Sequence, residues 1–269
     1  MFRVVGMKFP FGSTIHDYKT DLPDLQRGDV CVLETENGQG VAEVALPPRK
    51  LFYILQHKPM LNVLRKATPE DMERDRRNTA LQESIQRFCE QKIGERKTEM
   101  KLVRVEVALE GKKATVFFTA PGRIDFRDLV REVAQNFKIR IEMKQIGVRD
   151  EAKMFGGFGP CGLNLCCSSY LREFHPVSIR MAKDQDLPVN PSKISGVCGR
   201  LFCCLAYEHT TYVEMSKNMP HCGKTVCTKE GCGRVIKTHI LQERVTVEME
   251  DGKTVNARLD ELMEVALNE

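Results

Sequence analysis

The sequence predicts an α+β protein built from four segments along 269 residues. Turn-separated apolar runs at both ends are typical of small β-sheets, the middle carries apolar residues at helical spacing, and a repeated cysteine phrase lies between. We expect a small N-terminal β-barrel (residues 1–50), a central α-β-β-α-β two-layer domain (60–150), a Cys-rich insert of loops and short helices (154–218) and a C-terminal β-barrel-like segment (219–269).

The first segment consists of short apolar runs, and Asn37-Gly38 between two of them is a hairpin signal. The last segment has the same texture, with Asp251-Gly252 as its hairpin turn. The stretch GDVCVLETENGQGVAEV near the start resembles GKTVCTKEGCGRVIKT near the end, and the match pairs Val-Cys with Val-Cys and Gly-x-Gly with Gly-x-Gly. We therefore expect two related antiparallel barrels on either side of the middle.

The central domain begins with a helix start signal. Thr68 is suited to the N-cap, Pro69 to the first helical position and Asp71 to the acidic position of a capping box. The apolar face of that helix comprises Leu81, Ile85, Phe88, Cys89 and Ile93. LVRVEVAL and ATVFFT then predict a hairpin, Asp125 a cap for a second helix, and KIRIEM a third strand.

The cysteine phrases are CGLNLCC at 161–167 and CGRLFCC at 198–204, which are 37 residues apart and hold six of the 11 cysteines. Four thiolates match the ligand count of a [4Fe–4S] cluster or a structural zinc. The equivalent pairs are Cys161, Cys166, Cys198 and Cys203. Neighbours on a helix point about 100° apart, so Cys167 and Cys204 would serve a second cluster, a cluster shared with a partner, or the core. We expect a short helix after each phrase.

A further candidate set is Cys222, Cys227 and Cys232, with His221 adjacent. These residues would bind a metal together with a ligand from elsewhere, or be reduced cysteines in a β-barrel. For Cys31, Cys89 and Cys227 taken singly, core packing is the expected role because buried cysteine behaves as a small hydrophobe.

The doublets favour iron–sulfur chemistry over zinc, because zinc sites usually pair single cysteines two to four residues apart. Zinc stays the runner-up. The glycines at 156–163 lack the Lys and Ser/Thr of a P-loop and the full dinucleotide fingerprint. No Ser or Asp stands at a diagnostic spacing from His175, His209 or His221. We therefore expect that the protein is not an enzyme.

The net charge bears on nucleic-acid binding, and the apolar runs bear on the cellular compartment. The formal charge of +4 is too balanced for a basic nucleic-acid-binding face. The start MFRVVGMKFPFG lacks a signal-peptide core, and no apolar run is long enough to cross a membrane. We expect a cytoplasmic protein whose cysteines are thiols, metal ligands or transient redox groups rather than a permanent disulfide framework.

GGFGPCGLNLCCSSYL together with NPSKISGVCGRLFCCLAYE resembles the signature of the RicT (YaaT) family, proteins with a polymerase-suppressor-type C-terminal domain. The resemblance covers nearly the whole chain. It implies a ternary complex with two small helical proteins, RicA and RicF, that carries two [4Fe–4S] clusters. It also implies action with the endoribonuclease RNase Y in messenger RNA maturation, and promotion of sporulation, biofilm formation and competence, with an effect on the phosphorelay. The implied ligands are Cys161, Cys166, Cys167, Cys198, Cys203 and Cys204.

Three functions follow as hypotheses. The first is a non-catalytic iron–sulfur subunit that directs RNA processing, with RNA contact indirect or uncertain. The second is a zinc-stabilised nucleic-acid-binding module. The third is a redox enzyme that uses a cluster or a thiol.

Overall fold

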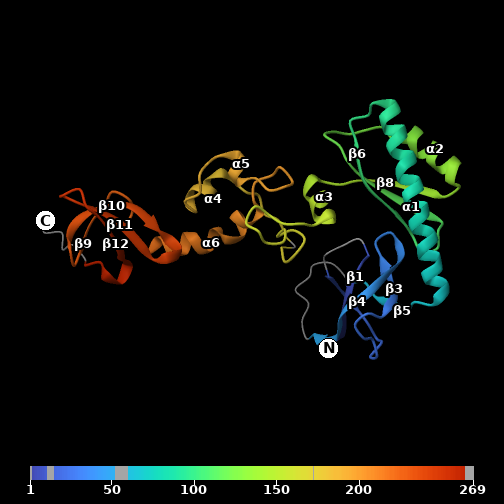
Figure 1. Ribbon diagram of the computed structural model, residues 1–269, viewed down its shortest axis with the longest axis horizontal. Helices are drawn as coiled ribbons and strands as arrows, with labels where there is room; N and C mark the ends of the chain where they lie inside the picture. Colours follow the sequence, from blue (N-terminus) through green and yellow to red (C-terminus); the bar gives the residue numbers. More distant parts are fainter. Residues whose placement is uncertain (1, 11–14, 52–59, 172, 264–269) are drawn as a thin grey trace. The chain divides into compact units, whose positions relative to one another are not determined.

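The computed structural model describes residues 2–10, 15–51, 60–171 and 173–263. The chain divides into two compact units, Met1–Tyr170 and Leu171–Glu269, and each is described by itself (Figure 1). Both units combine helices with antiparallel strands, so the predicted α+β class is confirmed. In the described part of the chain, no helix is both long and apolar enough to cross a membrane.

The first sheet has five antiparallel strands in the order β2-β1-β4-β3-β5. The strands are β1 (Phe2–Lys8), β2 (Ile15–Lys19), β3 (Val30–Thr35), β4 (Gly38–Leu51) and β5 (Val63–Lys66). The Asn37-Gly38 hairpin is confirmed between β3 and β4, where the Thr35 hydroxyl donates to the Gly38 carbonyl at 2.8 Å. Cys31, Leu33 and neighbouring apolar side chains form its core.

This sheet is not a closed barrel in the part of the chain that the structure describes, so the barrel detail of the prediction is not confirmed. Among the residues that the structure describes, an isolated bridge between Lys19 and Asn62 joins its two edges. The Lys19 amide donates to the Leu61 carbonyl at 2.9 Å. β5, from residues expected in the central domain, pairs with β3 and forms the second edge.

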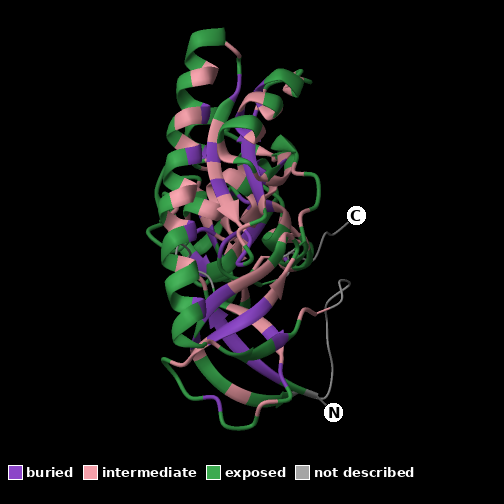
Figure 2. Ribbon diagram, turned by 90° about the vertical axis from the view of Figure 1, so that its right-hand side faces the viewer, coloured by how far each residue is buried: buried purple, intermediate pink, exposed green. Residues whose placement is uncertain are grey.

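The central elements follow the predicted order α-β-β-α-β. They are α1 (Pro69–Arg96), β6 (Lys101–Val107), β7 (Lys113–Thr119), α2 (Arg127–Phe137) and β8 (Arg140–Gln145). β7 pairs antiparallel with β6 and parallel with β8. Both helices pack on one face of the sheet, where Ile85 and Cys89 of α1 are fully buried (Figures 1 and 2).

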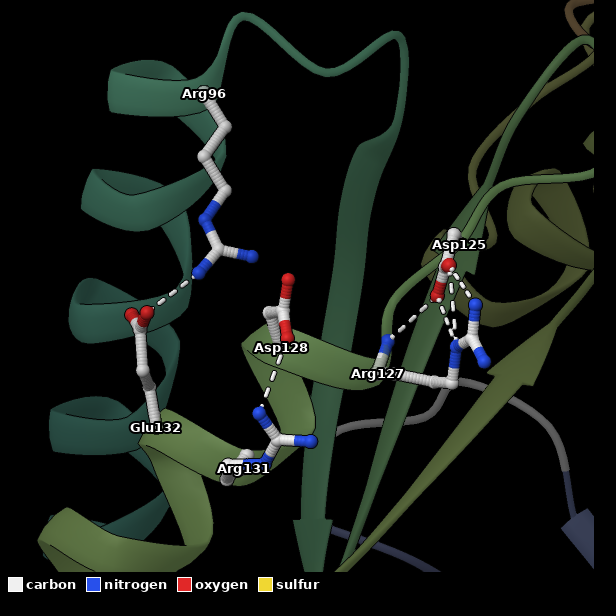
Figure 3. A network of polar contacts seen from close by, with 6 residues as sticks. All are labelled: Arg96, Asp125, Arg127, Asp128, Arg131 and Glu132. Carbon is white, nitrogen blue, oxygen red and sulfur yellow. Dashed lines mark hydrogen bonds and ion pairs between the residues drawn. The ribbon is translucent and has the colours of Figure 1, made fainter.

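Capping interactions fix the residue at which each of the two helices begins. The box at the start of α1 is confirmed: the Thr68 hydroxyl accepts from the Asp71 amide at 3.3 Å, and the Asp71 carboxylate accepts from the Thr68 amide at 2.9 Å. In α2 the N-cap is Phe126 rather than Asp125, one residue later than predicted. Asp125 still accepts from the Arg127 amide at 3.0 Å, so it orients the helix start from outside (Figure 3).

The β3–β4 turn contacts the side of the central sheet that carries no helix. The Asn37 amide donates to Glu106 at 3.1 Å, and Lys144 donates to Glu36 at 3.1 Å. The Leu109 amide also donates to the Gln39 carbonyl at 2.9 Å. These contacts join the first sheet and the central domain into one unit.

The second unit contains α4 (Ile179–Asp184), α5 (Pro191–Ile194), α6 (Cys203–Lys217) and an antiparallel sheet in the order β12-β11-β10-β9. Its strands are β9 (Thr225–Thr228), β10 (Gly231–His239), β11 (Arg244–Met249) and β12 (Thr254–Arg258), with 3-10 turns η1 (Ile240–Gln242) and η2 (Leu259–Glu261). The Asp251-Gly252 hairpin is confirmed by the Met249 amide donating to the Lys253 carbonyl at 2.8 Å. Within the described residues this sheet also remains open.

We expect Asp71→Ala to lower the free energy of unfolding by about 1–2 kcal/mol, because it removes the cap and leaves Arg65 and the Thr68 amide without their acceptor. The Arg65 guanidinium, followed by the Thr68 amide, lowers the pKa of Asp71. Its stabilisation is therefore complete above the unfolded pKa of about 4 and is lost as the pH falls. Urea unfolding at several pH values measures this. Exposed Glu70→Ala, in the same turn, is the control, and an equal loss for both variants would contradict the assignment.

Candidate metal centre

The first cysteine phrase lies on a tight loop after α3 (Val148–Phe155). The Gly159 amide donates to the Leu163 carbonyl at 2.8 Å, and the Gly162 amide donates to the Gly159 carbonyl at 2.9 Å. The Leu165 amide then donates to the Gly157 carbonyl at 3.1 Å, which closes the base of the loop.

The second phrase folds into the same loop. The Gly196 amide donates to the Arg200 carbonyl at 2.8 Å, the Gly199 amide to the Gly196 carbonyl at 2.9 Å, and the Phe202 amide to the Ile194 carbonyl at 2.9 Å. Every donor and every acceptor lies 37 residues after its counterpart in the first loop. The sequence repeat is therefore a repeat of backbone structure.

The glycine after the first cysteine of each phrase turns the loop. Gly162 has φ of 79° and Gly199 has φ of 72°, the left-handed region that other residues enter only with strain. No atom lies within 4 Å of the position that a Cβ would take at either glycine. Backbone conformation, rather than lack of space, selects glycine here.

A second glycine, which the sequence reasoning missed, stands two residues before each first cysteine. A Cβ at Gly159 would lie 3.3 Å from the sulfur of Cys161, and a Cβ at Gly196 would lie 3.7 Å from the sulfur of Cys198. The sulfur thus packs over bare backbone in both loops. The repeated unit is longer than first recognised, Gly-x-Cys-Gly-x-x-x-Cys-Cys, and the signal for it was present in both copies.

The phrase cysteines differ in exposure. Cys161 is exposed, Cys166 is half-buried, and Cys167 is buried, with only 8 % of its surface exposed. In the second loop Cys198, Cys203 and Cys204 are all half-buried. The two members of the first doublet therefore differ in burial, whereas those of the second doublet share one burial class.

The prediction of a helix after the first phrase is wrong, because residues 166–170 form turns. The hydroxyls of Ser168 and Ser169 donate to the Leu165 carbonyl at 3.1 and 2.9 Å, and such local bonds compete with helix formation. The helix expected after the second phrase is confirmed as α6, which begins at Cys203.

The second loop is held by packing between α4 and α6. His209 and Asp184 are joined at 2.9 Å between Nε2 and Oδ2, and the Gln185 amide donates to the Leu205 carbonyl at 2.7 Å. Buried Ala182 and Leu205 belong to the same small core. His209 therefore has a structural contact that accounts for it without metal ligation.

Convergence of the two phrases stays a prediction. Cys161, Cys166 and Cys167 lie in the first unit, and the cysteines of the second phrase lie in the other. Among the described residues of each unit, no three His, Cys, Asp or Glu side chains gather closely enough to hold a metal ion. The donor set itself, thiols on two loops of one shape, has the soft chemistry that iron–sulfur clusters and zinc require.

The C-terminal cysteines have a different arrangement. Cys227 on β9 and Cys232 on β10 stand directly opposite each other and form a disulfide. In this form neither sulfur is a thiolate that could bind metal, and Cys227 is half-buried rather than a core thiol. Cys222 and His221 are exposed in the turn before β9. The sequence contained a signal for this pairing, because the two cysteines stand on either side of a Thr-Lys-Glu-Gly turn.

Cys31 and Cys89 confirm the prediction of core packing. Both are fully buried. Burial raises the pKa of Cys31, and burial together with Glu90 raises the pKa of Cys89 to about 12. These two thiols are therefore inert packing groups, and they provide internal controls for the phrase cysteines.

Two family models match the chain. The PSP1 C-terminal conserved region matches residues 61–146, which run from the start of β5 through the central domain. The third domain of PSP1-like proteins matches residues 176–219, which contain α4, the second cysteine loop and α6.

Comparison of whole sequences identifies two relatives. The stage 0 sporulation protein YaaT of Bacillus subtilis is 39% identical over 267 residues, covering 98% of this chain and 96% of that protein. An uncharacterised protein of Schizosaccharomyces pombe is 35% identical over 119 residues, covering 44% of this chain and 14% of that protein. No solved structure matches the chain significantly.

We expect Gly162→Ala and Gly199→Ala each to lower the free energy of unfolding of the unit that carries it by about 1 kcal/mol, because alanine is strained at positive φ. Gly122→Ala is the matched control. Its position is equally open but lacks positive φ, so we expect no loss there. Urea unfolding of the three variants measures the difference, and equal costs at all three sites would contradict the role given to the two loop glycines.

We expect nine of the 11 cysteines to react with an alkylating reagent in protein denatured by guanidinium chloride at neutral pH without reductant, and all of them after reduction. Peptide mass spectrometry should then find Cys227 and Cys232 as the protected pair. Cys222→Ser should leave this pair intact. Labelling of all cysteines without reductant would return Cys227 and Cys232 to the candidate ligands.

Proposed function

The chain belongs to the family of the stage 0 sporulation protein YaaT, and we propose that it acts in sporulation as a non-catalytic iron–sulfur subunit. The observation that carries this proposal is the duplicated cysteine loop. Repetition of the backbone hydrogen bonds, the left-handed glycine and all three cysteines together exceeds what packing of buried thiols requires.

The residues that would hold the metal are the six phrase cysteines. They are Cys161, Cys166, Cys167, Cys198, Cys203 and Cys204. When bound, a [4Fe–4S] cluster links its thiolate ligands and can exchange an electron. The role of this chain is to present the thiolates from two preformed loops. Each loop carries three cysteines, so a four-thiolate centre needs a ligand from outside the single loop.

Exposed apolar side chains beside the cysteines support a role in a protein complex. Phe155, Phe158 and Leu163 of the first loop region are 68–70 % exposed. Near the second loop, Val197 is 63 % exposed and Tyr207 60 %. Large apolar side chains exposed around ligand cysteines are suited to a partner that covers the centre.

The proposed partners are two small helical proteins of the RicA and RicF type. Together with RNase Y, the complex would act in messenger RNA maturation, and through it in sporulation, biofilm formation and competence with an effect on the phosphorelay. A zinc-stabilised nucleic-acid-binding module is the second candidate, because the same thiol set fits zinc.

The deciding experiment is purification without oxygen, alone and with the two helical partners, followed by iron, sulfide, zinc and absorbance measurements. Iron and sulfide in matching amounts, with absorbance at about 400 nm, support the cluster. Colourless protein with stoichiometric zinc favours the second candidate. Metal-free protein in the assembled complex would overturn both.

We expect Cys161→Ser and Cys198→Ser each to lose most of the bound iron and to weaken partner binding, because each removes the same ligand position of one loop. Cys89→Ser is the control. It should keep the iron and cost about 1 kcal/mol of stability through its effect on the core. Iron content and pull-down of the partners measure this. Similar, mild losses in all three variants would contradict the assignment of the phrases as ligands.

A further inference from the structure

A pocket of about 830 Å³ opens in the first sheet, where the ends of four strands meet. Its walls include Arg3 from β1, Lys19 from β2, Lys50 from β4 and Val63 from β5. Among the described residues, the Lys19–Asn62 bridge joins the two edges of the sheet at this place, and both residues line the pocket. Its volume lies within the range of small-ligand sites.

The pocket carries an excess of positive charge. Three cationic side chains line it, against one carboxylate, Asp21, which leaves a formal charge of about +2. Arg3 and Lys50 are directly opposite each other on paired strands, an arrangement that is destabilising for like charges. Within the described residues, neither Arg3 nor Lys50 forms an ion pair. An anion between them would relieve this repulsion.

Polar and apolar groups complete the wall. Thr20 lines the pocket and is only 4 % exposed, and its hydroxyl oxygen accepts from the Leu22 amide at 3.1 Å, so its O–H remains a donor. The Thr20 amide donates to the Arg3 carbonyl at 3.1 Å, which joins the backbone of these two lining residues. Val63 and Leu64 give the same pocket an apolar side.

We propose that this pocket binds the phosphate group of a nucleotide, supplied either as a free nucleotide or within a single-stranded RNA. A phosphate carries one to two negative charges and accepts several hydrogen bonds, which matches two or three cations beside a hydroxyl. The apolar side provides room for sugar or base. The described lining contains no aromatic ring for base stacking, so affinity depends on the phosphate.

The test uses the purified full chain without metal, so its result is independent of the cluster proposal. The binding variant combines Arg3→Gln with Lys50→Gln. The matched control combines Lys8→Gln with Arg27→Gln, which removes the same charge from exposed cations of the same domain that do not line the pocket. Circular dichroism and thermal melting check that both fold, and Arg3→Lys with Lys50 intact should retain binding.

Two probes separate the sources: a fluorescent nucleoside triphosphate, and a short single-stranded RNA with a 5′-hydroxyl end. We expect the binding variant to weaken binding by about tenfold or more, because each charge-assisted contact is worth about 1.5–3 kcal/mol. For RNA, the salt slope should fall by about 0.7, because the two cations contact one phosphate of the strand. The control should bind like the wild type.

The outcomes decide the source as well as the site. Binding of the nucleotide alone assigns the pocket to a free nucleotide, and binding of RNA in competition with the nucleotide assigns it to the phosphates of a strand. No binding of either probe to the wild type overturns the proposal. Equal losses in the binding variant and the control also overturn it, because the effect would then come from net charge.

Discussion

The left-handed glycine after the first cysteine of each phrase is the constraint on which the candidate site depends. At Gly162 and Gly199 the chain reverses, which brings the amide two residues before each cysteine to the carbonyl two residues after it. The first sulfur then packs over the preceding glycine, and the doublet follows directly after the loop closes. Because these are backbone relations, the loop keeps its form although Leu163 in one copy is Arg200 in the other.

The same loop is supported differently in the two units. The second is followed by α6 and fixed through His209 and Asp184, whereas the first is followed only by turns. In the first unit, the β3–β4 turn is joined to the central sheet by Asn37–Glu106 and Lys144–Glu36 contacts. Burial, with the nearby charges of Glu36 and Glu106, raises the pKa of Tyr18 in β2 to about 12.

Features set by neighbours in sequence could be predicted, and features set by distant partners could not. The Thr68 capping box and the Asn37-Gly38 hairpin depend on a few adjacent residues, and both were found as expected. The pairing of β5 with β3 and the open edges depend on tertiary register, which composition and spacing do not encode. The residues after the two phrases also differ, since Ser168 and Ser169 follow the first doublet and the helix-forming Leu205 and Ala206 follow the second.

The similarity predicted between the two β segments is present in the structure, but the sequence alignment paired the wrong residues. Thr35 and Thr228 each donate from the hydroxyl to the carbonyl of the glycine three residues later, so the two hairpins share one turn. In that superposition Cys31 and Cys227 no longer coincide, although sequence alignment had matched them. Cys31 is a core residue and Cys227 a cross-linked edge residue because the turn, and not the cysteine, is what the two hairpins have in common. In the cysteine loops, by contrast, turn and cysteines recur together, which is the reason to assign those sulfurs a shared function.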